Sequence, residues 1–520
     1  MRLHNLRTIK RHLRLKQNIS RTRTHSTMTA VQLPLTPAEK LFRQCLLDCR
    51  GQMQDTPGMK DLVLRWTGGW VRDKLLGVQS HDIDVALSSM TGLQYGQAMQ
   101  DFMKEYGAKY EEEAIKQGIN HQVKDIHTIA ANPEKSKHLE TITTRIFGLD
   151  VDFVNLRKEV YDEQSRNPQM EFGTAEEDAL RRDATVNALF YNLDTQTVED
   201  FTRQGLDDMK KKIIRTPLSP FQTFKDDPLR VLRLIRFACR LGYEIESTAQ
   251  EAMKDKTIHK ALRLKISRER VGVEIGKIMA GPDPYTGLSY INAFDLYQTV
   301  FGDPMISDDD FPVDAAQALI AYGGLSRILE EKSSICLVLK PKEDQSLSWF
   351  LAAYSPFARS SVRAEQASRE GIKATNKMSK TLKDAIDLRP RILEVVKLVN
   401  EDKATRADVG MTLRQSKEAW RSHILFSLLC DIVEEDFSTV TDRYQRFVTF
   451  IHDQKLEDAH TVVPILNGNQ IKDALGGPKG GPWLKRAVDM LAQWQFNNPD
   501  APRDQAIETI ASKKQELGLG

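Results

Sequence analysis

Residues 62–87, LVLRWTGGWVRDKLLGVQSHDIDVAL, constrain the fold more than any other segment of this chain. A short apolar run ends at Gly68 and Gly69, and apolar runs bounded by glycine are typical of buried strands. The segment 70–76 predicts a helix that starts directly after this turn, so its first N–H groups face any bound anion. Because glycine lets the backbone approach a phosphate closely, the segment predicts a phosphate-binding turn.

Two aspartates follow on the next predicted strand. Side chains alternate between the two faces of a strand, so Asp82 and Asp84 share one face, while Ile83 and Val85 point to the core. Mg²⁺ prefers one or two carboxylates together with substrate phosphates. A lone Asp-x-Asp is usually an exposed strand end, but a carboxylate pair beside a phosphate-binding turn predicts a magnesium-dependent phosphoryl-transfer site.

The combination of these features resembles a known signature. Gly-Gly-x-Val-Arg-Asp, Leu-Leu-Gly and Asp-Ile-Asp occur in that order within residues 68–84. This order resembles the nucleotidyltransferase superfamily, and within it the branch that contains the class II CCA-adding enzymes and the bacterial poly(A) polymerases. The resemblance implies that the two aspartates are catalytic and hold Mg²⁺, and that Gly68, Gly69 and Arg72 bind the nucleotide.

Further strands are predicted at 123–129, 141–146 and 149–156, and the last of these places Asp150 and Asp152 on one face. Asp152 is a candidate for a third catalytic carboxylate. The alternation leaves open whether either aspartate points at the metal. Between the strands, the polar segment 127–140 is predicted to be a mobile connection near the active site, and a surface hairpin is the alternative.

A second motif, RRDATVNA at 181–188, resembles the RRDxxxNA motif of the same family. On a helix start, Asp183 and Asn187 share one face. They can there bind a ribose 2′-hydroxyl, which offers both a donor and an acceptor, while the planar guanidinium of Arg182 can bind a phosphate. Without its neighbours, the motif would indicate an ordinary helix-capping ion pair.

A third motif, KDDPLRVLRLIRF at 225–237, resembles the EDxxR motif of the family, with Asp226 where glutamate is common. In isolation, such spacing indicates an ion-pair ladder on an exposed helix. The motif predicts four nucleotide-binding side chains along one side of a helix, namely Asp227, Arg230, Arg233 and Arg236.

The chemistry of this face matches two bases. A carboxylate accepts from an exocyclic amine and a guanidinium donates to a ring nitrogen or carbonyl, so Asp227 and Arg230 complement cytosine and, at another angle, adenine. Uracil lacks the amine, and both uracil and guanine place a ring N–H against the arginine. The pair can therefore replace a nucleic-acid template, and Arg233 and Arg236 are left to hold the triphosphate.

The resemblance extends over residues 40–279 and ends with SRERVGVEIGKIM at 267–279, a helix predicted to support the Asp227 helix. From Ala179 onward no further strand is predicted. Apolar residues at intervals of three and four predict helices at 285–299, 315–329, 347–354, 382–400, 416–434 and 438–454.

Basic residues in this helical part are candidates for tRNA contacts. A polar helical pattern surrounds Arg363 and Lys373, for which an exposed surface without ligand is an equal alternative. Near the C-terminus, Gly480 and Gly481 precede a predicted helix whose N-terminus can bind an RNA phosphate. This segment resembles the tRNA-binding tail of the family, and its candidate residues are Lys479, Lys485 and Arg486.

The composition limits the class of protein. The 520 residues, 40% hydrophobic and 28% charged, are enough for several domains, and no apolar stretch approaches the ~20 residues of a membrane span. We therefore expect no membrane partner. Five cysteines without a CxxC pattern argue for a reducing compartment and against structural zinc.

The first 35 residues carry eight Lys or Arg and no acidic residue. Their helical spacing of leucines between arginines predicts a mitochondrial presequence, and a disordered RNA-binding arm is the alternative. Met28 is an internal start that would give cytoplasmic and nuclear forms. Without these eight charges the net charge of +2 becomes −6, so RNA binding requires a local basic surface.

The sequence thus predicts an α+β protein, with a nucleotidyltransferase head that contains a small mixed sheet, followed by an all-α neck, body and tail. The predicted boundaries are 1–35 for the presequence, 36–200 for the head, 201–282 for the neck, 283–400 for the body and 401–520 for the tail.

The resemblance implies a monomer that adds C, C and A to the acceptor end of tRNA from CTP and ATP. The terminal ribose hydroxyl would attack the α-phosphate, with Mg²⁺ on the aspartate pair and a second Mg²⁺ on the pyrophosphate. Alternatives within the family are poly(A) synthesis and partial addition of CC or A. A non-catalytic tRNA-binding protein is the alternative from another class, which the intact Asp-Ile-Asp argues against.

Overall fold

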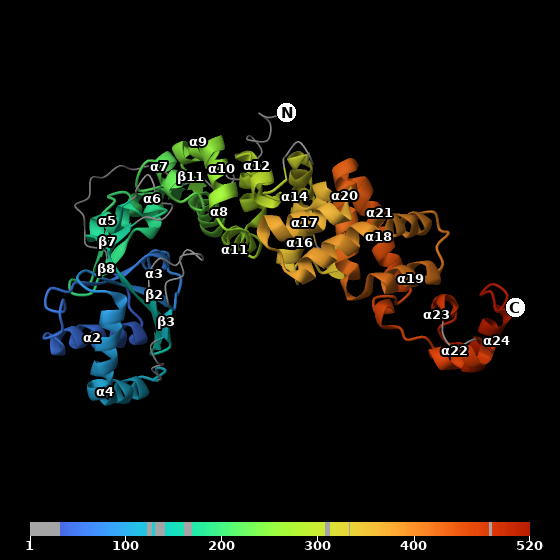
Figure 1. The fold of residues 1–520 in the computed structure, drawn as a ribbon, viewed down its shortest axis with the longest axis horizontal. Helices are drawn as coiled ribbons and strands as arrows, with labels where there is room; N and C mark the ends of the chain where they lie inside the picture. Colours follow the sequence, from blue (N-terminus) through green and yellow to red (C-terminus); the bar gives the residue numbers. More distant parts are fainter. Residues whose placement is uncertain are drawn as a thin grey trace. The chain divides into compact units, whose positions relative to one another are not determined.

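The computed structural model describes residues 32–121, 127–129, 141–160, 169–306, 312–331, 333–477 and 481–519. The predicted presequence up to residue 31, most of the predicted mobile connection at 127–140, and both Lys479 and Gly480 lie outside these residues. The chain forms two compact units (Figure 1). The first comprises the described residues up to Thr128 with Ile142–Val154 and Phe190–Glu199, and the second comprises the remainder.

The first unit is organised around a seven-stranded sheet with the order β3-β4-β5-β2-β1-β8-β9 in the described residues. The pairs β1–β2, β4–β5, β1–β8 and β8–β9 are antiparallel. The strands are β1 Leu64–Thr67, β2 Asp82–Leu87, β3 His127–Ile129, β4 Thr141–Ile146, β5 Leu149–Asn155, β8 Phe190–Asn192 and β9 Thr197–Glu199.

The α-helices in the described part of this unit are α2 Pro37–Gln52, α3 Gly69–Leu75 and α4 Gly92–Lys116. Thr36 and Thr91 cap α2 and α4, each within a complete capping box. In the core, Trp66 of β1 stacks on Phe42 of α2, with ring centroids 5.8 Å apart, and meets Trp70 edge-on at 4.7 Å. The aromatic cluster therefore fixes α3 at the end of β1.

The prediction that no strand follows Ala179 is wrong, because β8 and β9 lie beyond it and close one side of the sheet. All three residues of β8 are buried, so this strand shows no alternation of polar and apolar residues and is too short to be recognised by period. Two small sheets also occur in the second unit. They are formed by β6 Arg157–Val160 with β7 Gln169–Phe172, and by β10 Ile213–Ile214 with β11 Glu244–Ile245.

The second unit is otherwise helical, which confirms the predicted α+β class. Its α-helices in the described ranges are α5 Ala175–Leu180, α6 Gly205–Lys211, α7 Pro220–Asp226, α8 Arg230–Leu241, α9 Ser247–Met253, α10 Lys256–Lys265, α11 Arg268–Met279, α12 Pro284–Ala293, α13 Tyr297–Phe301, α14 Ala315–Glu330, α15 Ser334–Leu339, α16 Gln345–Ala353, α17 Ser361–Ile372, α18 Asn376–Asn400, α19 Arg406–Ser416, α20 Trp420–Glu434, α21 Phe437–Asp453, α22 Gly468–Leu475, α23 Pro482–Asn497 and α24 Arg503–Ser512.

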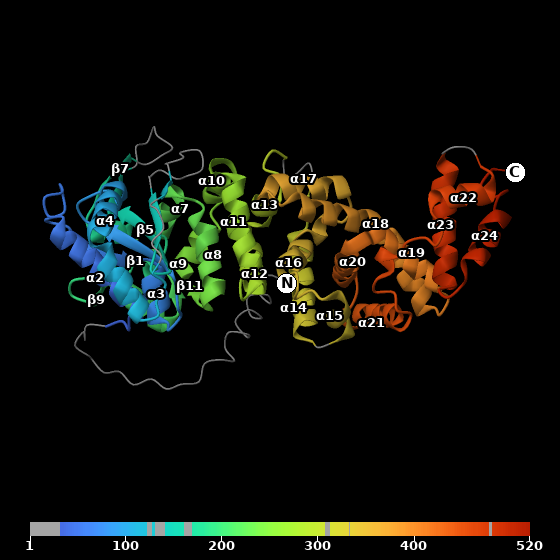
Figure 2. The same ribbon diagram turned by 90° about the horizontal axis from the view of Figure 1, so that it is seen from below.

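The predicted helices correspond to these elements with three differences. The helix predicted at 382–400 begins earlier, at Asn376. The segment 285–299 forms two helices instead of one, because Asp295 between α12 and α13 adopts a positive φ of 58°. The helix predicted to begin at 416 begins at Trp420. Helices α14, α16 and α20 lie side by side in the middle of this unit (Figure 2). No helix in the described part of the chain is long and apolar enough to span a membrane.

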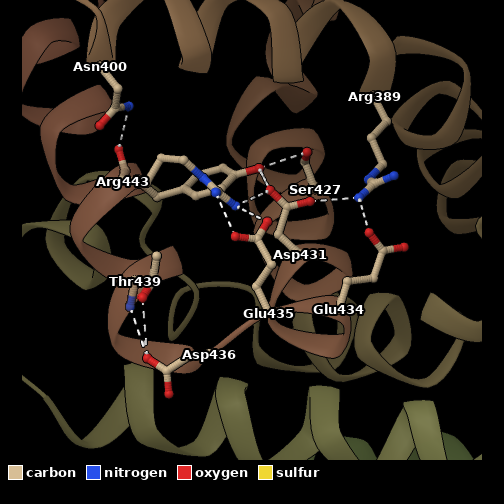
Figure 3. A network of polar contacts seen from close by, with 10 residues as sticks. Arg389, Asn400, Ser427, Asp431, Glu434, Glu435, Asp436, Thr439 and Arg443 are labelled. Carbon is tan, nitrogen blue, oxygen red and sulfur yellow. Dashed lines mark hydrogen bonds and ion pairs between the residues drawn. The ribbon is translucent and has the colours of Figure 1, made fainter.

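A buried ion network joins α18, α20 and α21 (Figure 3). Asp431 accepts hydrogen bonds from Arg389 at 2.6 Å, from Arg443 at 3.0 Å and from the Tyr444 hydroxyl at 3.0 Å. Its side chain is only 4% exposed. Both carboxylate oxygens are therefore satisfied by groups from other helices, as a buried charge requires.

Replacing Asp431 with asparagine is expected to lower the free energy of unfolding by about 2 kcal/mol, because two partly buried guanidinium groups lose a buried charged acceptor. Urea denaturation followed by circular dichroism measures this difference. Glu434→Gln is the matched control on the same helix, since Glu434 is 68% exposed and 3.9 Å from Arg389. Equal stabilities of the two variants would contradict the importance of the network.

Candidate active site

The two predicted catalytic carboxylates lie on one face of β2, as the sequence predicts. Ile83 and Val85 are fully buried, whereas Asp82 is exposed and Asp84 is partly exposed. In the β1–β2 pair, Asp84 lies opposite Thr67. Since Thr67 is the last residue before the glycine turn, the register brings the carboxylate pair to the same end of the sheet as that turn.

A second acidic strand borders this pair. β5 is the neighbour of β2 in the sheet, and the Asp150 N–H donates to the His81 carbonyl at 2.8 Å. Partial burial raises the pKa of Asp82, and the negative charges of Asp152 and Asp150 raise it further. A divalent cation would relieve this repulsion, so the donor set fits Mg²⁺.

The two aspartates of β5 differ in their partners. Asp150 is 56% exposed and lies 3.4 Å from Arg145 across the β4–β5 pair. Asp152 accepts a hydrogen bond of 2.7 Å from the hydroxyl of Thr143. Among the described residues, no group of three or more His, Cys, Asp or Glu side chains forms a metal site by itself. A site made of protein and substrate phosphates requires only two carboxylates, and Asp152 as a third catalytic group stays a prediction.

The backbone of the glycine turn adopts a conformation that favours glycine. Gly68 has φ 72° and ψ −133°, which side chains rarely tolerate, and Gly69 begins α3. Arg72 is only 3% exposed, and its guanidinium forms an ion pair of 2.7 Å with Asp73. Arg72 is therefore paired within α3, and its predicted contact with the nucleotide stays a prediction.

In the second unit, Asp183 and Asn187 meet as predicted, but not on a helix. Asp183 lies in a bend after α5, and Asn187 ends a short 3₁₀ helix, Thr185–Asn187. The Asn187 amide donates to Asp183 at 3.0 Å. The predicted helix start is therefore wrong in its geometry, although the two side chains do share one location.

The side chain of Arg182 is held by Asp178, which lies on the preceding helix α5. Its guanidinium donates to Asp178 at 2.8 and 3.0 Å and to the Asn187 carbonyl at 3.0 Å. Arg181 pairs with the same carboxylate. Burial opposes ionisation of Asp178, but the two arginines lower its pKa below the usual value. Asp178 and Arg182 are four residues apart at the end of a helix, and this spacing is the signal that would have revealed the pair.

Asp227 does not lie on the same helix as the arginines, so this part of the prediction is wrong. It is extended, with φ −134° and ψ 98°, and it precedes α8, which begins at Arg230. Pro228 disfavours the helical conformation for the residue before it, which explains the break. Both carboxylate oxygens of Asp227 are held, one by the Leu229 N–H at 3.1 Å and one by Arg270 at 3.2 Å.

Arg233 and Arg236 of α8 pair with two buried carboxylates, those of Asp183 and Glu274. Arg233 donates to Asp183 at 2.6 Å and lies 3.8 Å from Glu274. Arg236 donates to Glu274 at 2.5 Å. The side chain of Arg233 is 36% exposed, whereas that of Arg236 is 11% exposed. Arg233 is thus the more accessible of the two for a triphosphate, and Arg236 holds Glu274.

The carboxylate of Asp183 makes the stability of this region dependent on pH. Burial opposes its ionisation, but the Arg233 charge and the Asn187 amide lower its pKa to about 2. Its stabilising effect, about 2 kcal/mol, is present above the unfolded pKa of ~3.9 and is lost as the pH falls towards 2, because the unfolded state then binds more protons. We expect wild type to lose its advantage over Asp183→Asn between pH 5 and 2 in urea denaturation. A constant difference would contradict this coupling.

The predicted tRNA-binding residues are distributed over several helices of the second unit. Arg363 lies on α17, and Lys373 follows it with a positive φ of 50° and pairs with Glu370 at 2.8 Å. Lys485 and Arg486 lie on α23, where Arg486 donates to the Glu516 carbonyl at 2.8 Å. As predicted, Gly481 directly precedes α23. The tRNA contacts of these residues stay predictions.

Arg270 and Glu274, both on α11, are the residues that sequence reasoning did not include in the site. The motif at 267–279 indicated only a supporting helix, and α11 does pack against α8. The structure adds the direct contacts of these two side chains with Asp227, Arg233 and Arg236.

The chain resembles proteins of known fold along most of its length. A family model described as the poly A polymerase head domain matches residues 64–215. An apo CCA-adding enzyme aligns with a TM-score of 0.62 at 19% identity, covering 92% of this chain and 96% of that one. A CCA-adding enzyme in complex with ATP aligns with a TM-score of 0.61 at 18% identity, over 92% and 95% of the two chains. These likenesses show the fold.

Relatives found by sequence have a higher identity to this chain than these solved structures. The nucleotidyltransferase lcsQ of Purpureocillium lilacinum is 38% identical, with 93% of both chains covered. The mitochondrial CCA tRNA nucleotidyltransferases of Candida glabrata and Saccharomyces cerevisiae are 37% and 35% identical. The first alignment covers 88% of this chain and 91% of the relative, and the second covers 94% and 95%. With such identity over nearly complete chains, this protein belongs to the family of fungal CCA tRNA nucleotidyltransferases.

Proposed function

We propose that this protein adds C, C and A to the 3′ end of tRNA, using CTP and ATP and releasing pyrophosphate. The observation that carries the proposal is the intact pair of Asp82 and Asp84 beside the glycine turn, in a chain that aligns with CCA tRNA nucleotidyltransferases over 88% and 94% of its length. The carboxylate pair supports catalysis and argues against a protein that only binds tRNA.

The reaction forms a bond between the terminal ribose oxygen of tRNA and the α-phosphorus of the nucleotide, and it breaks the bond to pyrophosphate. Nucleotidyltransferases of this family generally use a divalent metal, which we propose to be Mg²⁺ held by Asp82 and Asp84. When bound, the ion stabilises the charge that develops on the phosphate oxygens. In the first unit, Gly68 and Gly69 allow a phosphate close to the backbone. In the second unit, the partly exposed guanidinium of Arg233 is suited to a phosphate group.

The base is selected by Asp227 and Arg230. Asp227 accepts from the exocyclic amine of cytosine or adenine, and Arg230 donates to the adjacent ring nitrogen or carbonyl. Arg270 and the Leu229 N–H fix the carboxylate from behind. Since uracil has no exocyclic amine and guanine directs a ring N–H at the arginine, UTP and GTP leave hydrogen-bonding groups of this pair unsatisfied. Asp183 and Asn187 hold the ribose 2′-hydroxyl.

One assay tests the proposal. Purified protein receives Mg²⁺ and a tRNA without its CCA end, with each nucleotide separately and then together. We expect two C residues with CTP alone and one further A when ATP is added. Long A tails from ATP alone would favour poly(A) synthesis, and a product that stops at CC, or that requires a preformed CC end, would indicate partial addition. Absence of any product would leave tRNA binding as the function.

We further propose a monomer that resides in mitochondria, with cytoplasmic and nuclear forms that start at Met28. The support is the basic leader in the sequence and the mitochondrial names of two relatives. Expression of the full chain and of the form that starts at Met28, each with a C-terminal fluorescent tag, tests this assignment. Equal mitochondrial import of the two forms would contradict the role of the leader.

A further inference from the structure

Helix α11 connects the base-reading residues with helices further along the chain. Successive residues of an α-helix are rotated by about 100°, so residues two positions apart lie on nearly opposite faces and residues four apart share a face. Arg270 and Glu274 therefore share one face of α11, and Arg268 and Gly272 share the opposite one.

The first face holds the nucleotide-reading groups. Arg270 lies 3.2 Å from Asp227, and Glu274 accepts from Arg236 at 2.5 Å and lies 3.8 Å from Arg233. Glu274 is 4% exposed. A shift of α11 by even a fraction of an ångström therefore moves the partners of both the base-reading carboxylate and the partly exposed arginine.

The second face is fixed to α13 and α17. Arg268 is 7% exposed and donates to three backbone carbonyls, those of Gly371 at 2.6 Å, Val300 at 2.6 Å and Thr299 at 3.2 Å. These carbonyls lie in the last turns of α17 and α13, where the helix leaves acceptors unsatisfied and its dipole favours a cation. Burial lowers the pKa of Arg268 to about 10, so the side chain remains charged at neutral pH.

Two glycines set the close approach of these helices. A Cβ added to Gly272 would overlap the carbonyl oxygen of Ile372 and lie 2.9 Å from its carbon. A Cβ added to Gly371 would lie 2.8 Å from the Phe301 oxygen. Backbone meets backbone at both points, so no side chain can rotate away to make room. The register of α11 against α17 is thus set by rigid groups.

We propose that Arg268 and Gly272 are positioning residues for nucleotide selection. They fix α11 against α13 and α17, and α11 in turn holds Asp227 and Arg233 through Arg270 and Glu274. This inference rests on the proposed function, because Arg268 and Gly272 act on base selection only if the opposite face of α11 holds the residues that read the base.

The test measures the kcat/KM for CTP and for UTP with a tRNA that lacks CCA, in wild type and in Arg268→Gln, Arg268→Met and Gly272→Ala. The discrimination against UTP is expected to fall about tenfold in Arg268→Met and Gly272→Ala, mainly through a higher KM for CTP, since a small misplacement weakens aligned contacts. Binding of tRNA, measured by filter retention, is expected to stay within about twofold of wild type. Arg268→Gln keeps one donor and is expected to lose less.

Gly276→Ala is the matched control. It lies one turn after Gly272 on the same helix, and nothing lies within 4 Å of a Cβ added there, so its discrimination should equal that of wild type. The proposal is judged on the variant with the largest structural change that still shows a cooperative thermal unfolding transition. A loss of activity that is equal for CTP and UTP, with unchanged discrimination, would show that Arg268 and Gly272 act only on stability. If wild type itself adds no C or A to tRNA, the proposed function fails instead.

Discussion

Alanine in place of Asp84 is expected to lower kcat/KM for CTP incorporation by about 10³-fold or more, since the site loses a charged group that stabilises the transition state. Asp84 is only partly exposed and lies opposite Thr67, beside the glycine turn, so its loss leaves Asp82 as the single carboxylate on this face of β2. Single-turnover incorporation of labelled CTP into tRNA without CCA measures the effect. The variant should fold normally and bind tRNA, because its side chain faces away from the core.

The matched control is Asp150→Asn. Asp150 contributes to the negative potential at Asp82, but it is 56% exposed and pairs with Arg145. We expect a change of less than about tenfold, because an exposed charge is screened by solvent. Asp152→Asn, measured in parallel, decides whether the second acidic strand supplies a catalytic carboxylate. Incorporation that is intact in Asp84→Ala would refute the assignment of the metal site.

Alanine in place of Arg230 is expected to reduce the discrimination between CTP and UTP by about 10- to 100-fold, the range expected when one bidentate base contact is lost. The remaining Asp227 carboxylate still accepts from an amine, but nothing then opposes the ring N–H of uracil. The measurement is the ratio of kcat/KM values for single-nucleotide incorporation, with ATP and GTP as the second pair. Binding of tRNA should not change.

Arg240→Ala provides the comparison on the same helix. Arg240 lies in the last turn of α8 and is exposed, so its loss should leave the selectivity intact. If Arg230→Ala and Arg240→Ala show the same selectivity as wild type, Asp227 and Arg230 do not read the base. If both lower it equally, the effect comes from the stability of α8 and not from a direct contact.

Much of the geometry around Asp82 and Asp84 could be predicted because its determinants are local. The two-residue period of a strand places Asp82 and Asp84 on one face, whatever surrounds them. The glycines at 68 and 69 permit the turn conformation, and Ile83 and Val85, which alternate with the aspartates, face the core. These features depend on a few neighbouring residues, and the structure has them as the sequence predicts.

The errors arose where a pattern was extended across a break. The spacing predicts Asp227 on the helix of Arg230, although Pro228 favours the extended conformation that the structure has. β8 was missed because three residues buried on both faces carry no period. Pro228 can be read from the sequence, whereas β8 is defined by its pairing with β1 and β9.

The sequence by itself determined which chemical groups are present. It also determined which side chains share a face of the same helix or strand. The tertiary structure decided which charged groups are paired. Arg236 meets Glu274 across 38 positions, and Arg268 caps a carbonyl 103 positions away. Such pairs depend on which distant helices pack together, and burial then makes each partner obligatory, because an unpaired buried charge is too costly. Local conformational preferences extend over a few residues only, and they contain no information about these contacts.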